Sequence, residues 1–283
     1  MELKPEDFNI IIGGGGYGTI YGSKKHPDIV MKTINATFCD CARDEYLMHK
    51  KIYDAFTSSL ICSKIDYISI PEPYFFTEHI RSHSYKKNCN YFMEKLHLID
   101  GHYIHICLND TISKKDREWR REDDEDIGED NPTRGFFASE EYIRDLLKRY
   151  KSKLKIQDII YRMGYLFSMM IFGASIYPID VEYGLTTREN EIYISAIDFG
   201  IVIPLDFDVK DRVEGNTCNP TDRSMEDIID SIFSEIYYTP EPKYIDDYKR
   251  GVTDAFKCFE QTLPKKARIF YEKLIEIIDM IGL

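Results

Sequence analysis

A glycine-rich segment near the start of the chain constrains the fold more than any other feature. It reads IIIGGGGYGTIYG over residues 10–22, and a further apolar run, DIVMKTI, follows at residues 28–34. Runs of β-branched residues broken by glycines predict a hairpin followed by a third strand. The pattern G-x-G-x-x-G begins at Gly13. Because a strand rather than a helix follows it, a Rossmann-type dinucleotide site is disfavoured.

The glycines of this segment admit two interpretations. Without a Cβ atom they permit positive φ and let backbone amides approach a phosphate closely, so the segment is either a plain turn or a flap over nucleotide phosphates. In the second case we expect the nucleotide to contact Gly13, Gly15, Gly16, Gly18 and Ile20.

Two charged residues follow the glycines. Lys32 lies near the end of the third apolar run, and Glu45 lies in a segment whose apolar spacing predicts a helix over residues 39–56. A lysine in an apolar strand is costly to bury without an anionic partner, which Glu45 would supply. Taken singly, each residue is more simply interpreted as an ordinary surface charge.

A third signal is the sequence Ile-Asp-Phe-Gly at residues 197–200, which follows a strand-like run at residues 191–197. An aspartate at the end of an apolar strand, followed by Phe-Gly, suits a divalent-metal ligand, because the strand holds the carboxylate and the glycine lets the chain turn away. Asp198 is therefore a candidate metal ligand.

With a glycine-rich segment, a strand lysine, a helix glutamate and Asp-Phe-Gly in this order, the sequence resembles the protein-kinase-like superfamily over most of residues 9–205. The resemblance implies that the segment YFMEKL at residues 91–96 is the last N-lobe strand and hinge, with Met93, Glu94 and Leu96 beside the nucleotide base. It implies ATP and Mg²⁺ as cofactors, Lys32 and Glu45 as the phosphate-orienting pair, and Asp198 as the metal ligand. It also implies a catalytic aspartate about 18 residues before Asp198, where Asp180 lies (198 − 180 = 18).

The departures from the kinase pattern concern the catalytic loop, H-R-D-x-x-x-x-N in kinases. All seven histidines lie at or before His105, so the loop has no histidine, and Leu185 stands where an asparagine would bind a second metal ion. Glu182 stands in place of a lysine and is a candidate carboxylate ligand for the metal. No A-P-E sequence follows Gly200.

These features favour an atypical ATP-dependent phosphotransferase that transfers the γ-phosphate to a hydroxyl of a protein or a small molecule. In this hypothesis Asp180 accepts the proton of the attacking hydroxyl. The alternative is a pseudokinase, which binds nucleotide or a partner without phosphotransfer. The expected fold is α+β and two-lobed, with a β-rich N-lobe at residues 1–95 and a mainly helical C-lobe at residues 96–283.

The remaining pattern completes this expectation. Strands are predicted at residues 74–78 and 90–96. A helix is predicted to begin at Ser139, with Glu140 and Glu141 in its first turn. An acidic insertion is expected at residues 110–138, a helix at 156–175 and a loop at 177–185. Two or three helices are expected over residues 223–238, 245–262 and 265–281.

The charge balance bears on partners. The formal net charge is −12, from 37 Lys+Arg and 49 Asp+Glu, which disfavours a dedicated nucleic-acid binder. Residues 1–95 are neutral, whereas residues 116–130 hold nine acidic residues and three arginines. That stretch is either a solvated insertion or, with Trp119 as an anchor, a docking element for a basic protein partner or acceptor.

The seven cysteines are an odd number and are scattered, which argues against a disulfide framework and favours a reducing, cytoplasmic location. We expect no secretory signal, and the longest uncharged stretch, residues 164–179, is short for a membrane span. His97, His102 and His105 are interpreted as scattered imidazoles rather than a metal site, and Cys39-x-Cys41 lacks the second pair that zinc requires.

Overall fold

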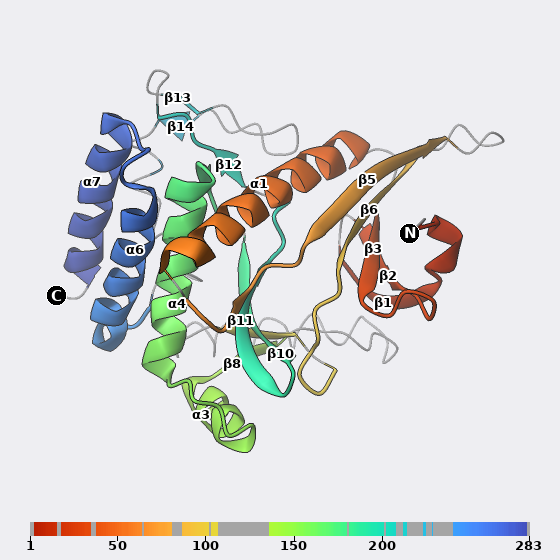
Figure 1. Ribbon diagram of the computed structural model, residues 1–283, viewed down its shortest axis with the longest axis horizontal. Coiled ribbons are helices and arrows are strands. Elements are labelled where there is room, and N and C mark those ends of the chain that lie inside the picture. Colours follow the sequence, from red (N-terminus) through yellow and green to blue (C-terminus); the bar gives the residue numbers. More distant parts are fainter. Residues whose placement is uncertain are drawn as a thin grey trace, which may run out of the picture.

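A β-rich part and a helical part make up the protein, seen in a computed structural model (Figure 1). The structure describes residues 3–15, 18–34, 38–63, 65–80, 87–101, 103–106, 136–179, 181–200, 202–207, 212–213, 223–224, 228 and 240–281. Helices α4 (Ile156–Ser168), α6 (Ile245–Phe259) and α7 (Lys265–Ile281) lie at the end of the molecule opposite the sheet formed by N-terminal strands. Helix α1 (Cys39–Ser63) runs between the two parts. This arrangement confirms the predicted α+β, two-lobed, kinase-like fold.

The N-lobe sheet has five antiparallel strands in the order β1-β2-β3-β6-β5. Its glycine hairpin pairs Gly15 with Gly18, as the sequence predicts. A Cβ at Gly18 would lie 2.5 Å from the carbonyl oxygen of Thr33, so glycine at this position allows β2 to approach β3. The strands are β1 (Ile10–Gly15), β2 (Gly18–Gly22), β3 (Ile29–Ile34), β5 (Pro73–Ile80) and β6 (Lys87–Glu94).

Helix α1 (Cys39–Ser63) is longer than the predicted 39–56. Most of its buried residues recur every three or four positions and so share one face: Cys39, Ala42, Glu45, His49, Ile52, Ala55, Phe56 and Ser59. The first half of that face packs with the N-lobe sheet, through Cys39 and Ala42. The second half joins the main core, through Ile52 and Phe56. One helix is therefore shared between the two lobes.

The C-lobe contains a second sheet in the order β4-β11-β10-β7-β8. The β10–β11 hairpin is antiparallel, and β4 pairs in parallel with β11, so a strand from the first hundred residues lies in the second sheet. The strands are β4 (Ile68–Ser69), β7 (Ile104–Ile106), β8 (Phe136–Ala138), β10 (Glu182–Arg188) and β11 (Glu191–Ile197). The short β9 (Ile176–Tyr177) pairs with β12 (Ile203–Pro204), and β13 (Arg212–Val213) with β14 (Arg223–Ser224).

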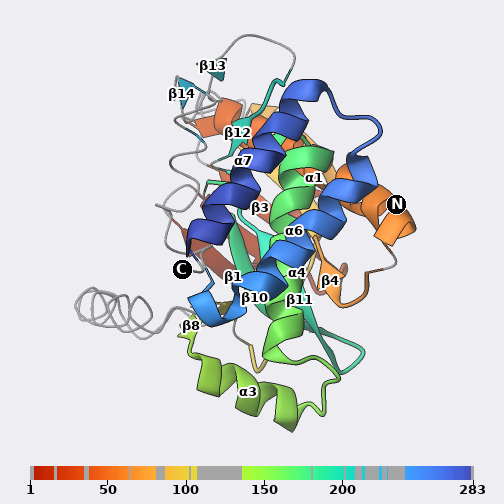
Figure 2. The same cartoon turned by 90° about the vertical axis from the view of Figure 1, so that its left-hand side faces the viewer.

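Among its described residues the C-lobe also contains the helices α3 (Glu140–Arg149), α4 (Ile156–Ser168), α6 (Ile245–Phe259) and α7 (Lys265–Ile281). Single turns occur at Pro5–Asp7 and Pro242–Tyr244, and α4 continues into a π-helical turn, Met169–Gly173. Ser139 caps α3 by accepting a hydrogen bond from the Tyr142 N–H, as predicted. Helices α4 and α6 lie side by side (Figure 2). Their contact requires glycine, since a Cβ at Gly164 would overlap the Tyr248 carbonyl.

Three predicted segments differ from the structure. Residues 136–138 form β8 rather than the end of a loop, while residues 107–135, including most of the acidic insertion, lie outside the described residues. The loop expected at residues 177–185 contains the start of β10. Glycine and polar residues in EYGLTTR obscured that strand, which pairing with β11 and β7 stabilises. Residues 223–224 are a strand, and most of the helix predicted at 223–238 lies outside the described residues.

The cysteine interpretation was wrong. Disulfides join Cys39 to Cys89 and Cys62 to Cys258. These pairs are 50 and 196 residues apart in the sequence, yet the fold brings their Cα atoms to 5.5 and 5.7 Å. Spacing along the chain therefore gave no sign of the pairing, and the cysteine count no longer supports a reducing compartment. Within the described residues, no helix is both long and apolar enough to cross a membrane.

Candidate functional site

Lys32 lies at the centre of the N-lobe sheet. In β3 it is opposite Ile20 of β2 on one side and Tyr91 of β6 on the other. The preceding residues Val30 and Met31 are buried, and the Lys32 side chain itself is only 16% exposed. The sheet therefore fixes the position of an amine that is nearly removed from solvent.

Glu45 supplies the partner of that amine. The Lys32 ammonium donates to both carboxylate oxygens of Glu45, at 2.7 Å to Oε1 and 2.9 Å to Oε2. Burial alone would lower the pKa of Lys32, but the carboxylates of Glu45 and Asp198 outweigh it and raise that pKa. The structure therefore holds a charged lysine between β3 and α1, paired as the sequence suggested.

Asp198 follows β11 and faces the same lysine. Its Oδ1 lies 3.9 Å from the Lys32 amine, and half of its side chain, 51%, is exposed. Its backbone has φ of 61°, in the left-handed region that non-glycine residues adopt rarely and at a cost of about 1 kcal/mol. A strained, half-exposed carboxylate beside a buried cation is a typical functional arrangement.

Behind these charges lies a residue that the sequence analysis did not single out, His49. Its ring is fully buried and lies 4.4 Å, between centroids, from the ring of Phe199. Burial lowers the pKa of His49 to about 3, so the imidazole is neutral. Since Nε2 lies 2.6 Å from the Pro71 carbonyl, which only accepts, Nε2 carries the proton and Nδ1 accepts from the Tyr91 hydroxyl. His49 follows Glu45 by four residues on the same helix face, which is the signal that could have found it.

The other candidate metal ligand, Glu182, begins β10. It is opposite Ile197, the residue before Asp198, and its Oε2 lies 3.4 Å from Nδ1 of His105. Its side chain is 37% exposed, and its charge acts on Lys32. Within the described residues no group of three or more His, Cys, Asp or Glu side chains forms a metal cluster. The site therefore offers one carboxylate at the start of β10 and one directly after β11.

Leu185, which stands in place of a metal-binding asparagine, is fully buried. It lies within β10 and is opposite Ile194. A buried leucine in the core of a hairpin offers no ligand atom. Asp180 and Gly16 lie outside the described residues, so the proposed proton acceptor and one glycine of the flap stay predictions.

The predicted hinge follows β6. The Lys95 N–H donates to the Asp28 carbonyl at 2.9 Å, which extends the pairing of β6 with β3, and Met93 is opposite Val30. Glu94 and Leu96 line a pocket of about 200 Å³ that the β10–β11 hairpin also borders. A second pocket, of about 510 Å³, lies between the end of α1, residues 65–70 and the same hairpin. Neither pocket includes Lys32 or Asp198, so both are separate from the charged cluster.

Comparisons with known proteins add little to this geometry. No protein-family model and no curated protein matches the sequence. Among solved structures the chain is similar to one described as WaaP in complex with acyl carrier protein, with 10% identity, covering 96% of this chain and 90% of that chain, at a TM-score of 0.39. A TM-score of 0.39 with 10% identity does not by itself establish a shared fold or function. The kinase-like fold therefore rests on the strand order of the two sheets and on the position of α1.

Proposed function

We propose that the protein is an atypical, kinase-like phosphotransferase that binds ATP with Mg²⁺ and transfers the γ-phosphate to a hydroxyl. The observation that carries the proposal is the buried Lys32–Glu45 pair with Asp198 at its open side. A buried ion pair is weak evidence for stability, because desolvation costs about as much as the pair gains. A pair of this kind beside a strained, half-exposed carboxylate is better explained by a ligand than by folding.

The residues fit the expected ligands. Mg²⁺ is bound by one or two carboxylates together with phosphates and waters, and it would neutralise the charge that develops on the transferred phosphate. Asp198, with Glu182 on the neighbouring strand, would hold it. In this proposal Lys32 binds and orients the phosphates, and Glu45 holds Lys32 in place. The glycines of the β1–β2 hairpin cover the phosphates, and Met93, Glu94 and Leu96 border the base.

The proposed chemistry needs a proton acceptor for the attacking hydroxyl. We assign it to Asp180, on the spacing to Asp198. The acceptor molecule is a protein or a small molecule, and the acidic residues 116–130 give a basic protein acceptor some support.

A second candidate function is a pseudokinase, which binds nucleotide without transfer. The buried Leu185 in place of a metal ligand favours it. Assays of γ-phosphate consumption with broad acceptors, alongside thermal-shift titration with Mg·ATP, separate the candidates. The phosphotransferase proposal expects that Asp180→Ala abolishes transfer and leaves the thermal shift nearly intact. A thermal shift without any γ-phosphate consumption, across protein and small-molecule acceptors, favours the pseudokinase.

Lys24→Ala is a matched control for Lys32→Ala, since Lys24 is an exposed lysine of the same lobe. We expect Lys32→Ala to remove the thermal shift and Lys24→Ala to keep it. If the parent protein shows no shift with Mg·ATP, both nucleotide-binding candidates are wrong.

A further inference from the structure

Helix α1 is held by a disulfide near each of its ends. Cys39, its first residue, is bonded to Cys89 of β6, and Cys62, its last residue but one, is bonded to Cys258 of α6. One bond therefore ties the helix to the N-lobe sheet and the other ties it to the C-lobe. Glu45, which pairs with Lys32, lies between the two bonds.

The two disulfides differ in their access to solvent. Cys39 and Cys89 are buried, at 3% and 0% exposure. Cys62 is exposed and Cys258 partly exposed. Disulfide exchange requires a thiolate to reach one of the sulfur atoms, so the Cys62–Cys258 bond is open to attack and the Cys39–Cys89 bond is protected.

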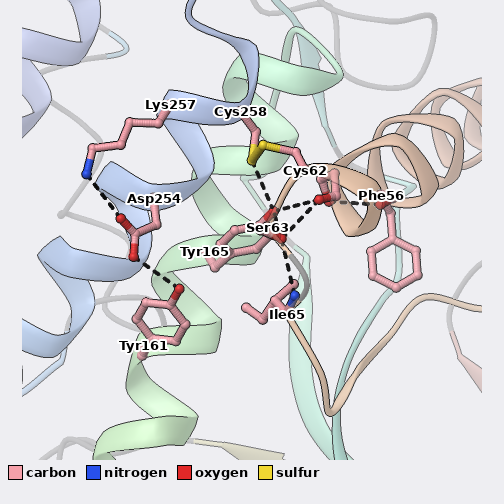
Figure 3. The surroundings of a disulfide bond; sticks show 10 residues. Phe56, Cys62, Ser63, Ile65, Tyr161, Tyr165, Asp254, Lys257 and Cys258 are labelled. Carbon is pink, nitrogen blue, oxygen red and sulfur yellow. Dashed lines mark hydrogen bonds and ion pairs between the residues drawn. A yellow bond between two sulfur atoms is a disulfide. The ribbon is translucent and has the colours of Figure 1, made fainter.

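Besides the disulfide, this end of the helix is held by core packing of Ala55, Phe56 and Leu60 and by hydrogen bonds from Tyr165. Figure 3 shows the Tyr165 hydroxyl of α4 beside the bond, donating to Ser63 Oγ at 2.7 Å and lying 3.9 Å from Cys258 Sγ. Nearby, Asp254 of α6 accepts from the Tyr161 hydroxyl of α4 at 3.2 Å. The second interaction joins α4 to α6 and does not involve α1. The disulfide is thus the covalent link between the end of α1 and a scaffold that is already assembled.

We propose that the Cys62–Cys258 disulfide is a redox-sensitive tether that keeps α1 in the position where Glu45 pairs with Lys32. A helix rises about 1.5 Å per residue, so Cys62 lies about 35 Å and Glu45 about 9 Å from the Cys39 end. If α1 pivots about its protected Cys39–Cys89 bond, a shift of about 4 Å at Cys62 moves Glu45 by about 1 Å. A shift of that size lengthens the 2.7 Å hydrogen bond beyond its normal range.

Opening the tether is ordinary thiol–disulfide exchange. A thiolate attacks one sulfur of the bond and forms a mixed disulfide, and the other sulfur leaves as a thiolate that takes up a proton. A second thiol of the reductant then displaces the protein cysteine. The two cysteines gain two electrons and two protons in total, and the reductant leaves as its own disulfide. Re-oxidation reverses these steps.

The test uses the full chain without nucleotide, so its outcome is independent of the proposed phosphotransfer. The oxidised protein is treated with a low concentration of dithiothreitol, and mass spectrometry identifies which disulfide has opened. Amide hydrogen exchange is then measured over α1, together with the rate at which an amine-reactive reagent labels Lys32. Lys24, which is exposed, is the internal reference for labelling.

We expect Cys62–Cys258 to open first, with exchange in the second half of α1 and labelling of Lys32 each rising about tenfold, equivalent to about 1.4 kcal/mol. Labelling of Lys24 stays constant. Cys62→Ser and Cys258→Ser should reproduce the reduced state without reductant, and Ile61→Ser, a change at the neighbouring residue that is 84% exposed, should not. The proposal is wrong if Cys39–Cys89 opens first, or if Lys32 labelling is the same with Cys62–Cys258 open and closed.

Discussion

The two halves of the candidate site differ in how deeply their charged side chains are buried. On the N-lobe side the side chains of Lys32 and Glu45 are 16% and 10% exposed and are bonded to each other, with neutral His49 packed behind them. On the C-lobe side Asp198 and Glu182 are 51% and 37% exposed. The N-lobe half is therefore buried and preorganised, whereas the carboxylates of the C-lobe half, which contact Lys32 and His105, keep exposed surface that a ligand can reach.

Substitutions in the two halves should therefore have different effects, on stability in one half and on ligand binding in the other. Substitutions in the N-lobe half (Lys32, Glu45 and His49), here called the closed half, disturb buried groups that contact one another and should lower the free energy of unfolding. Substitutions in the C-lobe half (Asp198 and Glu182), here called the open half, remove exposed charge and should leave that free energy nearly unchanged while reducing affinity for Mg·ATP. Four predictions test the contrast, from the largest expected effect on stability to the smallest.

Acid should destabilise the closed half through His49. The pKa of His49 is about 3 in the folded protein and about 6.5 in the unfolded chain, so the unfolded chain binds the proton more readily. Stability is fully present above pH 6.5 and is lost as the pH falls toward 3, by about 2 kcal/mol at pH 5 and about 4 kcal/mol at pH 3.

Urea unfolding between pH 7 and pH 4 measures this loss. His49→Gln, which keeps a donor and an acceptor but does not titrate, is the control, because its stability should depend less steeply on pH over the same range. Parallel curves for the parent and the variant would contradict a neutral, buried His49.

Glu45→Ala should lower the free energy of unfolding by about 3 kcal/mol, because it leaves the buried ammonium of Lys32 without its main partner. The double variant Lys32→Met with Glu45→Leu should lose less than the single variant, since no unpaired charge stays buried. Chemical denaturation of the three proteins provides the comparison. Equal losses in the single and double variants would show that the charge of Lys32 carries no desolvation penalty.

Thr186→Val tests the hairpin that supports the open half. The Thr186 and Ser195 hydroxyls, both buried, form a hydrogen bond of 2.6 Å between β10 and β11. Valine keeps the shape and leaves the Ser195 hydroxyl without that partner, so we expect a loss of about 1–2 kcal/mol in thermal or urea unfolding. No change in stability would mean that another group satisfies Ser195 in the variant.

Asp198→Asn should change the free energy of unfolding by no more than about 0.5 kcal/mol, since the carboxylate is half exposed. Asparagine tolerates the left-handed conformation at this position at least as well as aspartate does. Urea unfolding at neutral pH makes the comparison with Glu45→Ala. A loss as large as that of Glu45→Ala would remove the distinction between the two halves.

The sequence was informative wherever a short local pattern determines a short local structure. The glycine hairpin, the strand that holds Lys32, the helix that holds Glu45 and the cap at Ser139 follow from neighbouring residues, and all four elements are present. Relating Lys32 to Glu45 needed only the order of motifs along the chain. These parts were predictable because the strand and helix periods are visible within a few residues.

Long-range features were not predictable from the sequence. Strand β10 contains Gly184 and two threonines, and it is a strand because β7 and β11 flank it. The disulfides join residues from distant segments, which only the fold brings together. In the sequence, His49 cannot be told from the other six histidines. Only the fold places it beside Phe199, Tyr91 and Pro71. In each case the decisive neighbours are tertiary, so a pattern along the chain does not contain them.

Titration of the protein with Mg·ATP by calorimetry tests the central claim most directly, namely that the two halves form one nucleotide site. We expect the parent to bind one Mg·ATP, and Lys32→Ala and Asp198→Asn each to weaken binding by at least about tenfold, or about 1.4 kcal/mol. The exposed control Lys24→Ala should bind as the parent does. The absence of binding by the parent, or equal affinities in the parent and in both site variants, would contradict the account.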